Sequence, residues 1–155
     1  MQLDRYDVKI LNILQKNGRI TKSNLADEIN LSVSPCWERV KKLEQAGIIE
    51  GYGAKVNINK LFNQTSLMVE VSLKQHHANA FKQFEKLMSE TSEVTDCYAT
   101  GGGVDYILKI QTQDIDQYQR LIDRWLESDL GIERYYTYIV TKTIKQNASL
   151  VEYPN

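Results

Sequence analysis

Residues 31–47, LSVSPCWERVKKLEQAG, decide the fold of the first part of this chain. Cys36, Val40 and Leu43 recur at intervals of four and three residues, which is the spacing of the inner face of an amphipathic helix. The stretch has serines suited to an N-cap near its start and a glycine at its end, the usual boundaries of a helix. It therefore predicts a helix with one buried stripe and a free outer face.

Two further helices are expected before this one. Residues 4–16 carry apolar side chains at helical spacing, and Asp4 is suited to cap the first turn. A short second helix is expected from Thr21, and residues 30–32 leave only a tight turn before the third. Residues 48–56, IIEGYGAKV, have the pattern of a short β-hairpin. This order is that of a winged helix-turn-helix, with the hairpin as the wing.

The free face of the third helix is the candidate DNA reader, because an α-helix fits the major groove of B-DNA. Arg39 flanks the buried stripe, so its guanidinium is expected to reach a phosphate. An exposed Trp37 needs a partner, which is a base or sugar, another subunit, or a neighbouring helix. The alternative is a three-helix unit with a merely solvated face. The candidate residues are Ser32, Ser34, Pro35, Trp37, Glu38, Arg39, Lys41 and Lys42.

The second half of the chain has a different pattern. Alternating or β-branched runs predict strands at 67–73, 94–100, 106–110 and 132–144, and helical spacing predicts helices at 80–88 and 115–126. The order β-α-β-β-α-β is the ferredoxin-like arrangement. The predicted class is therefore α+β, with a winged helix-turn-helix domain at 1–56, a linker at 57–65 and a ferredoxin-like domain at 66–155.

The composition argues against a membrane-spanning or secreted protein, but it does not identify a function. The 155 residues are 42% hydrophobic and 25% charged, which is normal for a folded protein, and the net charge of −1 lends DNA binding no support. No apolar run approaches the roughly 20 residues of a membrane span, and the first residues lack a signal-peptide core, so a cytoplasmic location is expected. Cys36 and Cys97 are expected to be buried thiols, and His76 and His77 to be loop residues, rather than metal ligands.

Residues 31–52 closely resemble the recognition helix and wing of the Lrp/AsnC transcription regulators, and the resemblance continues at 3–7, 18–20, 96–101 and 105–109. The chain departs from the family at two places. Position 37 is often aliphatic in the family and is Trp here, and the segment before Asp105 often carries an acidic residue but reads GGGV here, at residues 101–104. The resemblance implies a sequence-specific regulator of double-stranded DNA whose oligomeric state or DNA affinity responds to a small effector, an amino acid. It also implies homodimers that assemble to tetramers or octamers.

The glycine run 101–103 allows two interpretations from its residues. It lacks the GxGxxG spacing, and it is either a tight hairpin turn or a place where a ligand approaches the backbone. The resemblance favours an effector site at a subunit interface, with Asp105 for the ammonium group and glycine N–H groups for the carboxylate. Apolar side chains expected in this site, at Ile115, Ile139 and Val140, favour an effector with an apolar or mixed side chain. The expected pocket is Ala99, Thr100, Gly101, Gly102, Gly103, Asp105, Ile115, Tyr138, Ile139 and Val140.

An enzyme is not expected, because the sequence has no nucleophile–base signature, metal cluster or phosphate loop. No cofactor or metal is expected beyond the amino-acid effector. Two alternatives stay open: an architectural DNA-binding protein without an effector, and an enzyme subunit of amino-acid metabolism, since ferredoxin-like domains host many chemistries.

Overall fold

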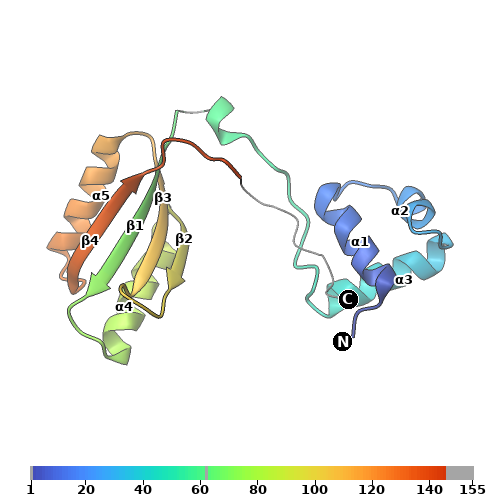
Figure 1. Ribbon diagram of the computed structural model, residues 1–155, viewed down its shortest axis with the longest axis horizontal. Coiled ribbons are helices and arrows are strands. Elements are labelled where there is room, and N and C mark those ends of the chain that lie inside the picture. The colour runs from blue at the N-terminus through green and yellow to red at the C-terminus, as the bar shows by residue number, and fades with distance from the viewer. Residues whose placement is uncertain (1, 62, 146–155) are drawn as a thin grey trace. The chain divides into compact units, whose positions relative to one another are not determined.

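The computed structural model describes residues 2–61 and 63–145. They form two compact units, one of residues up to Val56 and the other of Asn57–Ile144 (Figure 1). Each unit has its own hydrophobic core. The last part of the predicted second domain, residues 146–155, lies outside the described residues.

The first unit contains the three predicted helices, α1 (Arg5–Lys16), α2 (Lys22–Glu28) and α3 (Val33–Gln45). Asp4 and Asp7 form a reciprocal capping box at the start of α1. Thr21 caps α2 by accepting a hydrogen bond from the Asn24 N–H at 3.2 Å. The core of the unit is formed by Ile10, Leu11, Leu25, Ala26, Ile29, Cys36, Val40 and Leu43.

The strand pair predicted for the wing is not formed, since no strand is assigned in residues 48–56. Gly47 ends α3 at φ +68°, and the N–H groups of Ile48 and Ile49 both bond to the Leu43 carbonyl, at 3.0 and 3.2 Å. These two residues therefore complete the helix cap and do not begin a strand. Gly51 and Gly53 follow, and glycine offers no side chain to pack within a strand.

The second unit has the predicted ferredoxin-like order. Its four strands form one antiparallel sheet in the order β2-β3-β1-β4. Its elements are a short 3-10 helix (Ile58–Lys60), β1 (Thr65–Leu73), α4 (Ala78–Glu90), β2 (Val94–Ala99), β3 (Tyr106–Thr112), α5 (Ile115–Glu127) and β4 (Ile132–Ile139).

The last strand is shorter than the predicted 132–144. Among the described residues its neighbour in the sheet is β1, and Ile139 pairs with Leu67 near the start of that strand. The Val140 N–H bonds to the Ser66 carbonyl at 2.9 Å, and β1 begins at Thr65. β1 therefore has no further residues to pair with those beyond Val140.

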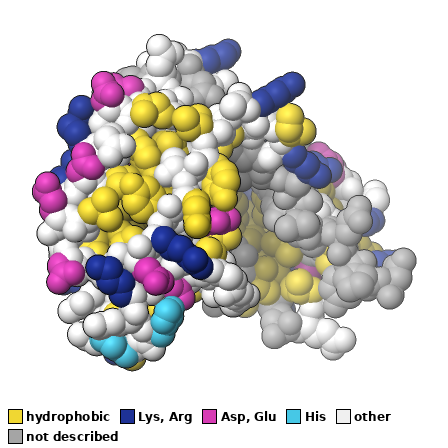
Figure 2. Space-filling model, turned by 60° about the vertical axis from the view of Figure 1, so that its left-hand side comes forward, with side chains coloured by type: hydrophobic (Ala, Val, Ile, Leu, Met, Phe, Trp, Pro, Cys, Tyr) yellow, Lys and Arg dark blue, Asp and Glu magenta, His cyan; other side chains and the backbone are white. Residues whose placement is uncertain are grey.

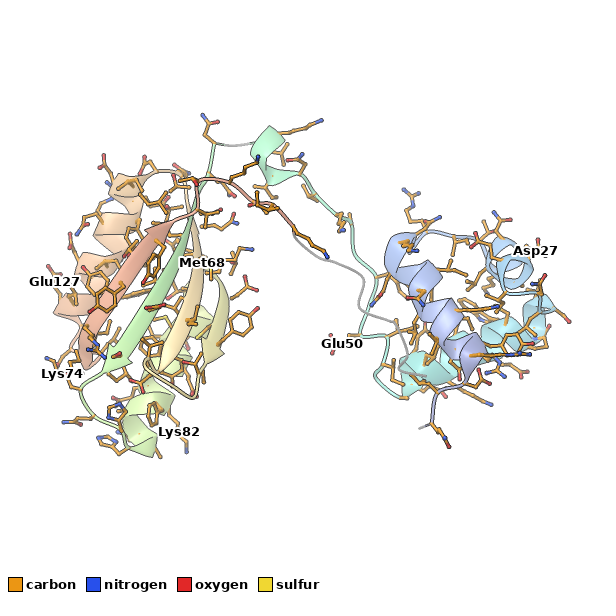
Figure 3. All side chains as sticks on the ribbon, viewed as in Figure 1. Asp27, Glu50, Met68, Lys74, Lys82 and Glu127 are labelled. Carbon is orange, nitrogen blue, oxygen red and sulfur yellow. The ribbon has the colours of Figure 1, made fainter. Side chains whose placement is uncertain are left out.

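The two helices of this unit pack on one face of the sheet, and the other face is open (Figure 1). β3 alternates strictly, with Tyr106, Leu108 and Ile110 buried and Ile107 and Lys109 only half-buried. Figure 3 labels Met68, which lies on the open face of β1, opposite Tyr138 of β4. No helix in the described part of the chain is long and apolar enough to cross a membrane.

Candidate DNA-binding and effector sites

The structure leaves the outer face of α3 accessible. Cys36, Val40 and Leu43 face the core, each at most 1% exposed. Ser32 is the N-cap, yet its side chain makes no capping hydrogen bond. The predicted residues that lie exposed on this helix or at its cap are Ser32, Ser34, Pro35, Glu38, Lys41 and Lys42.

Trp37 is half-buried rather than fully exposed, and its partner is a neighbouring helix. The indole packs against the core of the first unit. The ammonium of Lys22, the first residue of α2, lies 3.9 Å from the ring centre. Trp37 therefore links the two helices of the helix-turn-helix.

Arg39 was expected to reach a phosphate, but its guanidinium is directed at the start of α1. One of its nitrogens lies 2.7 Å from an Asp4 oxygen and 2.8 Å from an Asp7 oxygen. The side chain of Asp7 is only 6% exposed, so this carboxylate needs a partner. Arg39 thus joins α3 to the start of α1, and its guanidinium is already paired with two carboxylates.

The glycine run connects β2 to β3 without the backbone conformation that demands glycine. None of Gly101, Gly102 and Gly103 has a positive φ, and a Cβ at each would meet no atom within 4 Å. All three are exposed, and the Thr100 N–H bonds to the Asp105 carbonyl at 2.9 Å to close the turn. The run therefore forms the turn of the β2–β3 hairpin without positive φ at any of the three glycines, and it also offers unobstructed backbone.

Asp105 lies at the end of this turn and already has two partners. Its Oδ2 accepts a hydrogen bond from the Leu73 N–H at 2.7 Å. The Nε2 of His76 lies 3.2 Å from both carboxylate oxygens. A carboxylate offers about four acceptor positions, so room for a further donor remains. Sequence reasoning missed the role of His76, because nothing in the sequence pairs two residues 29 positions apart.

The predicted effector residues fall into two groups at opposite ends of the sheet. Ala99, Thr100, the glycines and Asp105 gather where β2 meets β3, beside Tyr106, which pairs with Val71 near the end of β1. Ile139 pairs with Leu67, near the start of β1, and Val140 follows it. Ile115 begins α5 just after Thr112, which pairs with Thr65 at that same end. Within a single chain, the ten predicted effector residues therefore do not form one pocket.

Tyr138 lies nearer the second group, on the open face of the sheet. It is 52% exposed, and its hydroxyl donates to a Glu70 oxygen at 3.4 Å. The negative charge of Glu70, followed by desolvation, raises the pKa of Tyr138 above its usual value. This phenol stays neutral at physiological pH and remains a hydrogen-bond donor.

The two thiols differ, which corrects the expectation that both are buried. Cys36 is buried in the first unit, whereas Cys97 on the edge strand β2 is exposed. Burial raises the pKa of the Cys36 thiol, so it stays protonated. Within the described residues, no group of three or more His, Cys, Asp and Glu is placed to hold a metal ion.

Both parts of the chain match known family models. Residues 3–50 match a winged helix-turn-helix DNA-binding model, and residues 66–150 match the Lrp/AsnC ligand binding domain. The chain belongs to the Lrp/AsnC family. It is therefore a transcription regulator with a DNA-binding helix-turn-helix and a ligand-binding domain.

Relatives of this Lrp/AsnC protein align along nearly all of its length. It is 60% identical to the transcriptional regulatory protein DoeX of Halomonas elongata, over 97% of this chain and 96% of the relative. It is 37% identical to the leucine-responsive regulatory protein of Escherichia coli, over 96% and 91%.

Solved structures of Lrp/AsnC regulators share the fold. A regulator from Neisseria meningitidis in complex with L-Met has a TM-score of 0.89 at 33% identity, with 96% of each chain covered. The Escherichia coli AsnC structure has a TM-score of 0.84 at 27% identity, covering 94% of this chain and 97% of that one.

Proposed function

We propose that α3 reads operator DNA in the major groove through the exposed residues of its outer face. The observation that carries this proposal is that Ser34, Glu38, Lys41 and Lys42 point away from a core formed by the inner face of the same helix. Serine and glutamate side chains bond to base edges, and lysines bind phosphates. Trp37 supports the helix from its flank.

Two substitutions on α3 test this assignment. Lys41→Ala should weaken binding to operator and random DNA alike, and flatten the salt dependence by about one unit, as a lost phosphate contact does. Ser34→Ala should change the preference among operator variants. Lys82→Ala on α4, where Lys82 is also exposed, is the matched control in gel shifts (Figure 3). Wild-type behaviour of both α3 variants would exclude α3 as the reader.

The effector that we propose is an amino acid with an apolar or mixed side chain. The Neisseria relative was solved with L-Met, and the exposed glycine backbone with Asp105 offers donors and an acceptor for a carboxylate and an ammonium group. Because the ten residues divide between the two ends of the sheet, the pocket is completed by a second subunit, which supplies the group at Ile115, Ile139 and Val140. Effector binding then acts on assembly or on DNA affinity.

The proposed assembly is a homodimer that forms tetramers or octamers in the cytoplasm. Figure 2 shows hydrophobic side chains gathered on one face of the second unit, among acidic and basic ones. Tyr98, Tyr136 and Tyr138 belong to the open face of the sheet and are 52–58% exposed. An exposed apolar surface of this kind is typical of a protein interaction site. The proposal assigns the chain no catalytic activity.

A second candidate is an architectural DNA-binding protein without an effector. The observation that favours it is that Leu73 and His76 already occupy acceptor positions of Asp105. Isothermal titration against the 20 amino acids, each up to millimolar concentration, separates the two functions. The regulator predicts heat of binding for at least one amino acid and its loss in Asp105→Ala. No binding at all would favour the architectural function.

A further inference from the structure

A cation at the start of α2 lies outside the set of DNA-binding residues described above. Lys22 is exposed, and its ammonium lies 3.9 Å from the centre of the Trp37 ring on α3. A cation above the face of an indole is attracted by the negative charge of the ring face. The contact therefore holds the lysine side chain in one direction, across the two helices of the helix-turn-helix.

The stability of α2 does not explain a lysine at this position. The positive end of the helix dipole disfavours a cation in the first turn, and Thr21 already provides the cap. Among the described residues, none of the ion pairs includes Lys22. Its charge is thus available to a group outside the chain.

We propose that Lys22 is a further phosphate-binding residue of this regulator and that Trp37 is the residue that positions it. In a helix-turn-helix the first helix crosses the DNA backbone while the second lies in the groove, so the start of α2 is close to a phosphate strand. Lysine loses much side-chain freedom when it binds. A ring that fixes the lysine beforehand reduces that loss. The ring covers one side of the Lys22 ammonium, and the other N–H donors of the ammonium remain for phosphate oxygens.

The first test removes the cation. In Lys22→Ala, one phosphate contact is lost, so the slope of log affinity against log salt should fall by about 0.9, and the affinity at 0.1 M salt by about five- to tenfold. Operator and random DNA should be affected equally, since phosphates carry no sequence information. Lys82→Ala removes the same charge from an exposed position on α4 and should leave the slope unchanged. A Lys22→Ala protein with the wild-type slope would overturn the proposal.

The second test separates positioning from packing with a double-mutant cycle. In the presence of Lys22, Trp37→Leu should weaken DNA binding by about two- to fivefold, the worth of an exposed cation–π contact, and Trp37→Phe should weaken it less. In the Lys22→Ala background both changes at Trp37 should weaken DNA binding less than they do in the presence of Lys22, because only the packing contribution of the indole remains. Equal losses in the two backgrounds would show that Trp37 acts through the fold alone, and would overturn its positioning role. If circular dichroism shows that Trp37→Leu is unfolded, Trp37→Phe alone completes the cycle.

Discussion

At the scale of single residues, Arg39 illustrates how long-range partners redirect a side chain. Its guanidinium joins Asp7, which lies 32 positions earlier and is almost fully buried. It also lies 5.4 Å from the centre of the Tyr6 ring. Removing one partner of such a pair leaves a charge in a poorly solvated place, which costs more than the pair itself contributes.

Arg39→Ala is therefore expected to lower the free energy of unfolding by about 2 kcal/mol. The value is set below that of a fully buried pair because the Arg39 side chain is 30% exposed. Urea denaturation at pH 7 measures it. Arg5→Ala is the control, since Arg5 is exposed and contacts its neighbour Tyr6, stacking on the ring and donating a hydrogen bond to the hydroxyl at 3.1 Å; it should cost less than about 0.5 kcal/mol. Equal costs for the two variants would contradict this role of Arg39.

Asp4 gives the same cluster a pH dependence. Desolvation opposes the shift, but the Asp7 N–H, the Arg39 side chain and the Tyr6 N–H together lower the pKa of Asp4. The stability gained is present above the unfolded pKa of about 4 and is lost as the pH falls through the folded pKa. Asp4→Asn keeps a capping residue but does not titrate.

Between pH 5 and pH 2, the wild type is therefore expected to lose more stability than Asp4→Asn. Thermal unfolding along this pH series measures the difference. Parallel curves for the two proteins would show that Asp4 has the same pKa in both states.

At the scale of elements, the end of α3 depends on Gly47. Its φ of +68° is strained for any residue with a Cβ, although a Cβ there would meet no atom within 4 Å. Gly47→Ala should thus cost about 1 kcal/mol of stability from backbone strain alone. Gly51→Ala, where φ is not positive, should be neutral within about 0.5 kcal/mol. Denaturation midpoints that shift equally in both variants would exclude this cap as the cause.

Most elements of the fold were predictable from local pattern. The periodic spacing of Cys36, Val40 and Leu43 predicts a helix without reference to any distant partner, and α3 spans these residues in the structure. The wing and the end of β4 were not predictable, because a strand exists only where a partner offers hydrogen bonds. The N–H groups of Ile48 and Ile49 are bonded to the Leu43 carbonyl and are not available to a strand partner. β4 stops pairing where β1, its partner, begins.

The candidate sites were predictable in their place along the chain but not in their contacts. The outer face of α3 follows from helical spacing, so its exposed residues could be named. The Asp7–Arg39 and Leu73–Asp105 contacts each join residues 32 positions apart, and no periodicity reports such pairs. The division of the effector residues between two sheet ends follows from strand register, which the sequence leaves undetermined.

At the scale of the whole molecule, the open face of the sheet predicts self-association. The wild-type chain should be at least dimeric at micromolar concentration in light scattering. Replacing Tyr136 and Tyr138 together by lysine places charge on that face, beside Glu70, and should lower the mass. Leu126→Lys is the control, because Leu126 is also exposed, at 48%, but on α5. A wild-type monomer, or equal masses for both variants, would contradict assembly through the sheet.

In the proposed regulator, an effector bound to the second unit changes the affinity of the first unit for DNA. The most direct measurement is the affinity of the full chain for operator DNA, with and without each amino acid at millimolar concentration. At least one amino acid should change the DNA dissociation constant by about 5- to 150-fold, and DNA should change the affinity for that amino acid by the same factor. Asp105→Ala should abolish the change and leave unliganded DNA affinity near normal. A DNA affinity that no amino acid alters would contradict this coupling between effector and DNA binding.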